Sequence, residues 1–343
     1  MRARKDKNML KYIIKRLLLS VLILFGVSVI VYALVRCMPI DYIDIKYGEA
    51  ARTNEAVALR IQEFKEIYGI ADNSFGGIIK GYFGWLGNLL KGDLGTSFKY
   101  EKPVGEVISE NMWISFGIAL VATVLQFLIS IPLGITSATH QYSARDYTVT
   151  VFTMIGLSLP TYFFAAICIK VFAVDLGWLP ANGLVYGGKI YADTFAGGLE
   201  KFGDIIVHLL MPILVSVILS IGGLMRYTRT NMLEVLNSDY IRTARAKGLS
   251  ENKVIYRHAF RNTLIPLATL LAGILPGLFG GMLITEQVFG IPGIGNLAYT
   301  ALRDGDIPFI MGYNMFLAIL TVIGTLLSDI MYSIVDPRVK LTK

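Results

Sequence analysis

The chain alternates long apolar segments with shorter polar ones, and six apolar segments are long enough to cross a membrane. The first, residues 17–35, holds 19 residues without a charge. As a helix it would extend about 28 Å, enough to cross the hydrocarbon core of a bilayer. The other segments are 113–138, 147–174, 207–225, 264–285 and 309–334. The pattern predicts an all-α integral membrane protein with six transmembrane helices.

Composition and charge support this interpretation. Of 343 residues, 54% are hydrophobic and 17% are charged, whereas soluble domains carry roughly a quarter of charged residues. With the N-terminus in the cytoplasm, the inner segments 1–16, 138–146, 226–262 and 334–343 carry 19 Lys and Arg against 6 Asp and Glu. The outer segments carry 12 against 18. By the positive-inside rule we expect both termini in the cytoplasm, and the net charge of +7 requires no nucleic acid partner.

This orientation divides the chain into four parts. Residues 1–35 form a basic cytoplasmic N-terminus, which we expect to rest on membrane lipid, and the first transmembrane helix. Residues 36–112 form an extracytoplasmic region with a helix expected over residues 54–68. Residues 113–334 hold transmembrane helices 2–6, and residues 335–343 form a cytoplasmic tail.

Prolines and glycines interrupt several of the expected spans. Four prolines lie inside spans: Pro132, Pro160, Pro212 and Pro276. Each removes a helix hydrogen bond, so kinks are expected, either around a central path or as ordinary packing kinks. In the fifth span Gly273, Gly277 and Gly281 recur every fourth residue, which would allow another helix to approach closely.

A basic, polar insert follows the fourth apolar segment, over residues 237–266. Its first half is predicted to be a short amphipathic helix, because apolar residues recur at spacings of three and four: Leu233, Leu236, Tyr240 and Ala244. Arg242 and Arg245 fall on the opposite side. Gly248 stands where a left-handed C-cap is expected, and Ser250 is placed to cap a second helix.

In that second helix Lys253, Arg257 and Arg261 recur every fourth residue and form one cationic stripe. Two helices joined at a glycine corner make a protruding hairpin that another protein can bind. The alternative is a positively charged cytoplasmic loop that only determines topology and rests on lipid headgroups.

The order of residues in the hairpin carries a resemblance. The run DYIRTARAKGLS, followed by RHAFRNTLIP, closely resembles the coupling loop of binding-protein-dependent ABC importer permeases, in the version of the oligopeptide, dipeptide and nickel family. The wider superfamily pattern is Glu-Ala-Ala, three residues, Gly, and nine residues to Ile-x-Leu-Pro. It is met only in part, because Arg242, Thr243 and Ala244 stand at the Glu-Ala-Ala positions. Likewise His258, Phe260 and Arg261 stand where Ile, Leu and Pro would fall.

Other segments are similar to the same family, in its first-permease type (oligopeptide permease B). They are the run 92–97 with Pro103 and Val104, Ser158-Leu159-Pro160, Trp178-Leu179-Pro180, and Asp329, Tyr332 and Asp336-Pro337-Arg338 near the end. The resemblance therefore covers nearly the whole chain.

The resemblance implies the type I ABC importer permease fold and one of two permease subunits that import oligopeptides or dipeptides across a bacterial cytoplasmic membrane. It implies a second homologous permease, two nucleotide-binding ATPase subunits and an extracytoplasmic substrate-binding protein as partners. The residues it implies for contact with an ATPase subunit are Asp239, Tyr240, Arg242, Thr243, Ala244, Arg245, Ala246, Lys247, Gly248, Leu249 and Ser250. It identifies no residue of the substrate path.

The sequence holds no catalytic constellation of its own. Residues 183–189 fit G-x-x-x-x-G-K, but Ile190 stands where a P-loop needs Ser or Thr for magnesium, and the segment is expected outside the cell. Two cysteines and three scattered histidines suggest neither a disulfide framework nor a metal site. We expect a non-catalytic subunit that binds no cofactor, with ATP and magnesium bound by its partners.

Three other functions remain as alternatives. A secondary transporter or channel without ATP coupling would need ionisable groups within the membrane, and only Lys170 and Asp329 come near. A membrane-embedded enzyme or scaffold would need a nucleophile or metal constellation, and none is visible. An ABC permease for nickel or another solute would look similar, because the binding protein recognises most of the substrate.

Overall fold

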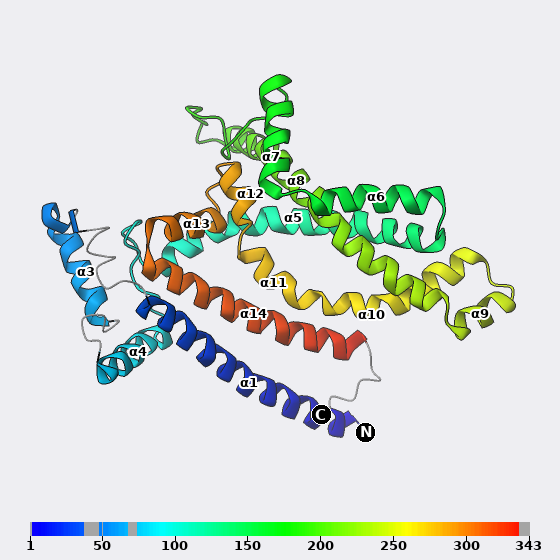
Figure 1. Cartoon of the computed structure of the whole chain (residues 1–343), viewed down its shortest axis with the longest axis horizontal. Helices are drawn as coiled ribbons and strands as arrows, with labels where there is room; N and C mark the ends of the chain where they lie inside the picture. Colours follow the sequence, from blue (N-terminus) through cyan, green and yellow to red (C-terminus); the bar gives the residue numbers. More distant parts are fainter. Residues whose placement is uncertain (1, 38–47, 50, 68–73, 336–343) are drawn as a thin grey trace. The chain divides into compact units, whose positions relative to one another are not determined.

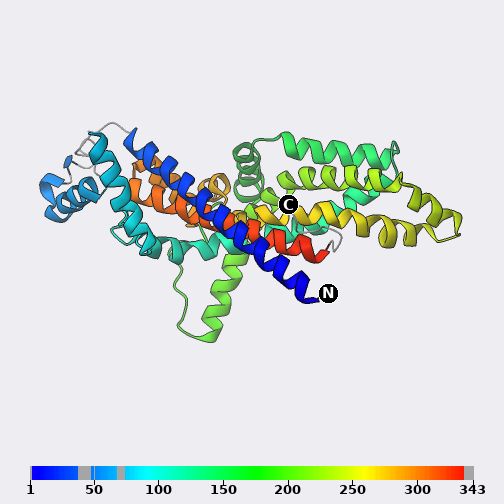
Figure 2. The same ribbon diagram turned by 90° about the horizontal axis from the view of Figure 1, so that it is seen from below.

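The chain is helical throughout the part that the computed structural model describes, which comprises residues 2–37, 48–49, 51–67 and 74–335. These ranges contain no β-strand, only an isolated bridge between Thr96 and Pro103. The expected match at Asp336-Pro337-Arg338, like the tail from residue 336 onward, lies outside them. The prediction of an all-α architecture is therefore confirmed for the described residues, as Figures 1 and 2 show.

The chain divides into two compact units, which are described one at a time. Of the described residues, the first comprises those up to Trp113 together with Leu297–Leu326, and the second comprises Ile114–Asn296 and those from Leu327 to Val335. The first unit holds α1 (Arg2–Arg36), α3 (Glu55–Ile67), α4 (Phe75–Leu90), the start of α5 (Val104–Thr139), most of α13 (Ile294–Asp304) and most of α14 (Ile307–Val335). The second holds the rest of α5, then α6 (Ala144–Ser158), α7 (Thr161–Cys168), the π-helical η1 (Ile169–Asp175), α8 (Phe195–Leu236), α9 (Asp239–Ala246), the π-helical η2 (Lys253–Phe260), α10 (Arg261–Thr269), α11 (Leu271–Phe279) and α12 (Leu283–Val288).

Four of the described helices are long and apolar enough to cross a membrane. These spans are Ile14–Leu34, Val104–Thr139, Phe195–Leu236 and Ile307–Asp329. A fifth is present if α6 and the segment Thr161–Asp175 count as one bent span. The structure confirms the apolar helical spans, whereas the count of six stays a prediction.

The third expected span, residues 147–174, is broken rather than continuous. Its two halves, Ala144–Ser158 and Thr161–Asp175, meet at an angle of 101°. The physical cause is Pro160, whose ring pushes the preceding residue out of the α-helical region. Leu159 accordingly adopts an extended backbone with φ −79° and ψ 130°. The bend expected at Pro160 is therefore present, and it is sharp enough to divide the expected span into two helices.

The fifth expected span, residues 264–285, is divided among three short helices. α10 ends at Thr269, α11 covers Leu271–Phe279, and α12 begins at Leu283. Gly281 lies between α11 and α12 with φ +76°, which a residue inside a right-handed helix cannot adopt. The prediction that Gly273, Gly277 and Gly281 share one helix face was therefore wrong, since only the first two lie on α11.

An aromatic core holds the first unit together. Tyr32 of α1 and Tyr82 and Trp85 of α4 are all at least 92% buried, and they pack with Ile61 of α3 and Met311 of α14. The Tyr32 and Tyr82 rings meet edge to face, with centroids 5.4 Å apart, a favourable arrangement for aromatic pairs. The helix expected over residues 54–68 is confirmed as α3, which packs against this core.

A buried carboxylate anchors the loop that precedes α5. Asp306, which is fully buried, accepts hydrogen bonds from the Ser97 hydroxyl and from the backbone N–H groups of Phe98 (3.2 Å), Lys99 (3.1 Å) and Phe309 (3.3 Å). Nearby Lys99 forms an ion pair with Asp304. A hydrogen bond from Lys99, followed by one from Arg303, lowers the pKa of Asp304 to about 2.

A second buried carboxylate organises the loop after α11 in the second unit. Glu286 of α12 is fully buried and accepts hydrogen bonds from the Ser115 hydroxyl (2.7 Å) and from the backbone N–H groups of Met282 (2.9 Å) and Asn296 (3.0 Å). The Ser115 oxygen in turn accepts the N–H of Ile294 (2.8 Å). These donors satisfy the buried carboxylate, so Glu286 has a structural role in this loop.

Candidate functional site

The basic insert of the sequence folds as a helical hairpin at the end of α8. α8 ends at Leu236, and Ser238 turns the chain with an extended backbone (φ −74°, ψ 152°). The Ser238 hydroxyl donates to the Val235 carbonyl oxygen over 2.6 Å, which satisfies one of the free carbonyls at the end of α8. α9 then covers Asp239–Ala246, and a second helix follows after Ser250. We call residues 237–262 the hairpin.

The corner of the hairpin is the glycine that the sequence indicated. Gly248 has φ +74°, in the left-handed region that favours glycine. Its N–H donates to the Arg245 carbonyl oxygen over 2.9 Å, and that of Lys247 donates to Thr243 over 3.1 Å. Both bonds satisfy carbonyls of the last turn of α9. The predicted left-handed cap at Gly248 is therefore confirmed.

A small apolar core attaches the hairpin to the rest of its unit. Its buried residues come from four helices: Ile135 and Ala138 of α5, Met232 and Leu236 of α8, Ile241 and Ala244 of α9, and Val254 and Ala259 of η2. The sequence pattern placed Tyr240 on the buried face, but its side chain is 46% exposed and Ile241 is buried in its place. The reason is the turn at Ser238, which shifts the buried face of α9 relative to that of α8.

Polar contacts brace the two helices of the hairpin across its corner. The Arg245 guanidinium donates two hydrogen bonds to Glu251, one from Nη2 over 2.7 Å and one from Nε over 3.2 Å. The hydrogen bonding between these two side chains lowers the pKa of Glu251 and raises the pKa of Arg245. The amide of Asn262 donates to the Tyr240 hydroxyl over 3.2 Å. The corner is thus closed by side chains as well as by backbone.

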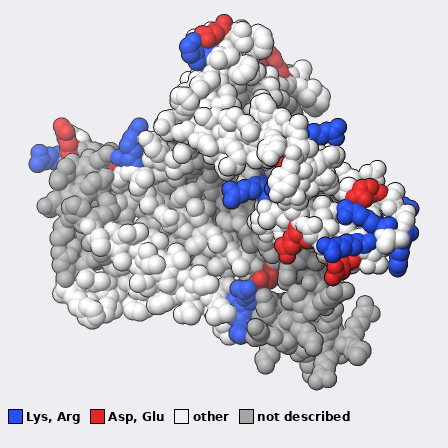
Figure 3. All heavy atoms as spheres, turned by 45° about the vertical axis from the view of Figure 1, so that its right-hand side comes forward, with Lys and Arg blue, Asp and Glu red and all other residues white. Residues whose placement is uncertain are grey.

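The outer surface of the hairpin is polar and largely basic. Of the eleven residues singled out in the sequence, nine are exposed, Leu249 is half-buried and Ala244 is buried. Figure 3 shows Lys, Arg, Asp and Glu atoms gathered at the right-hand end, which carries α9 in Figure 1. The sequence-predicted residues are therefore brought together on one protruding surface, with Ala244 and Leu249 supporting it from below.

The second helix of the hairpin has an unexpected backbone. Lys253–Phe260 is π-helical, a rare form with hydrogen bonds between residues i and i+5 that is frequent at functional sites. Lys253, Arg257 and Arg261 are exposed while Val254 and Ala259 are buried. The cationic stripe expected from the sequence thus lies on the solvent side.

A cavity of about 500 Å³ lies between α5, α8 and α11 of the second unit. Its polar groups come from Thr123 and Gln126 of α5 and from Ser216, Ser220 and Tyr227 of α8, and glycines of α11 also line it. The Gln126 amide donates to the Ser220 carbonyl oxygen over 3.1 Å. None of the described lining residues is charged. This lining could not be identified from the sequence, because the sequence does not show which helix faces meet.

No cluster of three or more His, Cys, Asp or Glu side chains among the described residues has the arrangement of a metal site. Lys189, the lysine of the near P-loop pattern, forms ion pairs with Asp204 (2.8 Å) and Glu200 (3.1 Å) instead.

Comparison with known proteins places the hairpin inside a matched region. Residues 130–341 match the family described as "Binding-protein-dependent transport system inner membrane component". The chain belongs to this family. It is therefore a membrane component of a transport system, and we call it the permease below. The matched residues include α6 to α12 and the whole hairpin.

Individual relatives match the permease over nearly its full length. The Oligopeptide transport system permease protein AppB of Bacillus subtilis is 39% identical over 97% of this chain and 100% of its own. The Dipeptide transport system permease protein DppB of Alkalihalophilus pseudofirmus is 32% identical over 97% of this chain and 100% of its own. Among solved structures, a chain described under "Inward facing conformations of the MetNI methionine ABC transporter: CY5 native crystal form" has a TM-score of 0.49 and 15% identity, over 67% of this chain and 96% of that chain.

Proposed function

We propose that the permease is one of the two membrane-spanning subunits of a bacterial ABC importer for oligopeptides or dipeptides, and that its hairpin docks on an ATPase subunit. The observation that carries this proposal is the protruding hairpin, in which an exposed basic surface is braced by Arg245–Glu251 and capped at Gly248. A loop that only determines topology needs no such bracing. Peptide-transport permeases among the relatives support the substrate class.

The hairpin suits the transmission of a mechanical step. Its apolar core joins it to α5 and α8, so a push on the outer surface reaches both helices through packed side chains. In the proposed cycle, separate ATPase subunits bind ATP and magnesium, close on each other and carry the hairpin with them. The permease supplies the path and the transmission, and alternating access follows from the movement of its helices.

The proposed assembly also has a second homologous permease and an extracytoplasmic binding protein that delivers the substrate. In this arrangement both termini of the permease lie in the cytoplasm, because the inner segments carry the excess of Lys and Arg. The region 36–112 then faces the binding protein. The same proposal includes the division of the chain at the membrane into residues 1–35, 36–112, 113–334 and 335–343.

The cavity between α5, α8 and α11 is our candidate for the permease's share of the substrate path. Its volume of about 500 Å³ lies in the usual range for sites of small ligands. Neutral hydroxyl and amide groups can bond the main chain of a peptide without selecting the charge of its side chains, which suits an importer of varied peptides.

The test is purification of the tagged permease from its native membrane with identification of the chains that copurify. We expect a second permease, ATPase subunits with P-loops, and peptide uptake that requires ATP and the binding protein after reconstitution into vesicles. A permease that transports alone, with an ion gradient as its only energy source, would refute the proposal and favour a secondary transporter. Uptake of a nickel chelate but of no peptide would refute the substrate class alone.

A further inference from the structure

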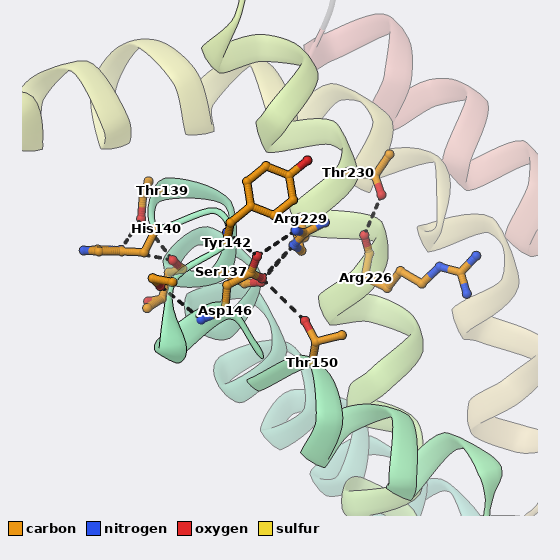
Figure 4. Close-up of polar contacts among 11 residues, drawn as sticks. Ser137, Thr139, His140, Tyr142, Asp146, Thr150, Arg226, Arg229 and Thr230 are labelled. Carbon is orange, nitrogen blue, oxygen red and sulfur yellow. Dashed lines mark hydrogen bonds and ion pairs between the residues drawn. The ribbon is translucent and has the colours of Figure 1, made fainter. Parts of the chain in front are cut away.

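A compact polar cluster lies about two helical turns before the hairpin on α8, and the proposed function makes no use of it. It joins the end of α5, the start of α6 and the last third of α8. Arg229 of α8 donates from Nη2 to Asp146 Oδ2 over 2.8 Å and from Nε to Asp146 Oδ1 over 3.0 Å. Ser137 of α5 donates its hydroxyl to the same carboxylate and accepts from Arg229 Nε over 2.9 Å. Figure 4 shows these side chains pointing toward one another from their three helices.

The Asp146 carboxylate also holds the turn between α5 and α6. It accepts the backbone N–H of Tyr142 over 3.0 Å. Tyr142 has φ +63°, a left-handed conformation that is unusual for a bulky residue and requires support from its surroundings. Ser143 caps α6 by accepting the Asp146 N–H over 3.3 Å. One carboxylate therefore sets both the turn and its attachment to α8.

The cluster is shielded from solvent on its acidic side. The Asp146 side chain is 4% exposed, whereas that of Arg229 is 25% exposed. A buried carboxylate without a cationic partner is strongly unfavourable, so the pair has to stay together in any conformation that keeps Asp146 buried. The described groups that face the carboxylate are Arg229, Ser137, Tyr142 N–H and, at 3.5 Å, the Thr150 hydroxyl.

Three glycine contacts prevent α8 from sliding along α5 and α6. A β-carbon on Gly134 of α5 would lie 2.7 Å from Thr228 of α8. One on Gly156 of α6 would lie 2.8 Å from the Ile218 carbonyl oxygen of α8. One on Gly222 of α8 would lie 2.5 Å from the Thr153 carbonyl oxygen of α6. The three helices are in backbone contact at these points, so they resist shear.

These helices lead directly into the hairpin. Arg229 lies seven residues before Leu236, the end of α8, which is about 10 Å along the helix, and the hairpin follows directly. Ile135 and Ala138, next to Ser137 on α5, are part of the apolar core of the hairpin. A displacement of the hairpin therefore reaches α5 and α8 by packing, but it reaches α6 at its first turn through Asp146.

We infer that Asp146, Arg229 and Ser137 are positioning residues that clamp α6 to α8, so that α6 moves with the hairpin during the transport cycle. The clamp deepens the proposed function and rests on it, since it acts only if an ATPase subunit moves the hairpin. Without the clamp, the first turns of α6, which lie ahead of the glycine contacts at Thr153 and Gly156, no longer follow α8. ATP is then hydrolysed with little substrate movement.

The experiment uses the complete importer in vesicles, with substrate transport and ATP hydrolysis measured together. For Asp146→Asn and Arg229→Gln we expect about a tenfold loss of substrate transported per ATP hydrolysed, with stimulation of hydrolysis by the binding protein retained. Arg226→Gln is the matched control, because Arg226 lies one turn away on α8 and is exposed; its ratio should equal that of the wild type. Exchanging the charges, Asp146→Arg with Arg229→Asp, should recover part of the ratio.

A spectroscopic distance keeps the test decisive even if a variant assembles poorly. Spin labels at Val151 of α6 and Glu234 of α8, both exposed, should keep the same separation in the wild-type importer with and without trapped nucleotide. In Asp146→Asn the distribution should broaden on nucleotide binding. A wild-type change of more than about 2 Å, or unchanged coupling in both single variants, would overturn the clamp. If the wild-type importer itself shows no ATP-driven transport, the proposed function fails instead.

Discussion

Gly248 allows a test of the hairpin in which only the backbone conformation changes. Its φ of +74° lies in the left-handed region, and a β-carbon added there would meet nothing within 4 Å. A substitution therefore creates no steric clash with the rest of the permease. Any effect on the hairpin of the permease by itself must come from the energy of the backbone conformation.

The magnitude follows from the conformational preference of each residue. The left-handed conformation costs about 1–2 kcal/mol for a residue with a β-carbon, and asparagine tolerates it better than others. A free energy of this size lowers the ratio of native to non-native corner conformations about fivefold to thirtyfold. We expect Gly248→Asn to have the smallest effect, Gly248→Ala an intermediate one and Gly248→Val, with its branched β-carbon, the largest.

The assay is substrate transported per ATP hydrolysed by the importer in vesicles, combined with hydrogen exchange of the hairpin amides. Exchange over residues 239–260 should quicken in the order Asn, Ala, Val, while membrane insertion and the exchange of α5 and α8 stay unchanged. The transport ratio should fall in the same order, because a distorted corner no longer presents a rigid surface to the ATPase.

A matched control separates the hairpin from general loss of stability. Gly177 also has a positive φ, +62°, with nothing near an added β-carbon, but it lies in the loop after η1. Gly177→Val should leave coupling intact. Wild-type coupling in Gly248→Val, or equal effects of Asn and Val, would show that the left-handed corner has no part in transmission.

Three further predictions follow from particular contacts. Arg242→Cys should crosslink to an ATPase subunit far more readily than Ala244→Cys, because Arg242 is exposed whereas Ala244 is only 7% exposed. Equal crosslinking of the two variants would contradict the packing of α9. Gly222→Ala should destabilise the permease by about 1–3 kcal/mol through overpacking, measured as a lower midpoint of thermal aggregation in detergent, whereas Gly223→Ala, with no atom near its added β-carbon, should not. The pKa of Asp304 is lowered to about 2, so its ion pair should stabilise the loop fully at pH above the ordinary carboxyl range near 4 and lose this effect as pH falls to about 2. Protection of the amides of residues 97–102 against hydrogen exchange, relative to the unfolded chain, that is already lost at pH 4 would refute this.

Local features of the permease could be predicted from the sequence because they depend on neighbouring residues. Apolar length alone identified the spans that the structure has as α1, α5, α8 and α14. The sequence also predicted helix α3 and the left-handed corner at Gly248, which depend on residues close together in the chain. The resemblance of the hairpin run to peptide permeases pointed to the family that the comparison then confirmed.

Local patterns failed where a break or a turn changed the geometry. The apolar run over residues 147–174 has the length of one span, but Pro160 divides it at an angle of 101°. Tyr240 fitted the apolar spacing of α8, yet the turn at Ser238 rotated the pattern and buried Ile241 instead. In both cases the apolar residues keep recurring at helical spacing through a residue at which the helix itself ends.

Contacts between distant residues were decided by the tertiary structure alone. Asp146 and Arg229 are 83 residues apart, and Ser115 and Glu286 are 171 residues apart. Each is an ordinary polar residue in the sequence. The glycines that bring α5, α6 and α8 into contact look like the many others of an apolar chain. A hydrophobic period shows which residues avoid water, but the partner of a buried charge is selected only when the helices pack and desolvate it.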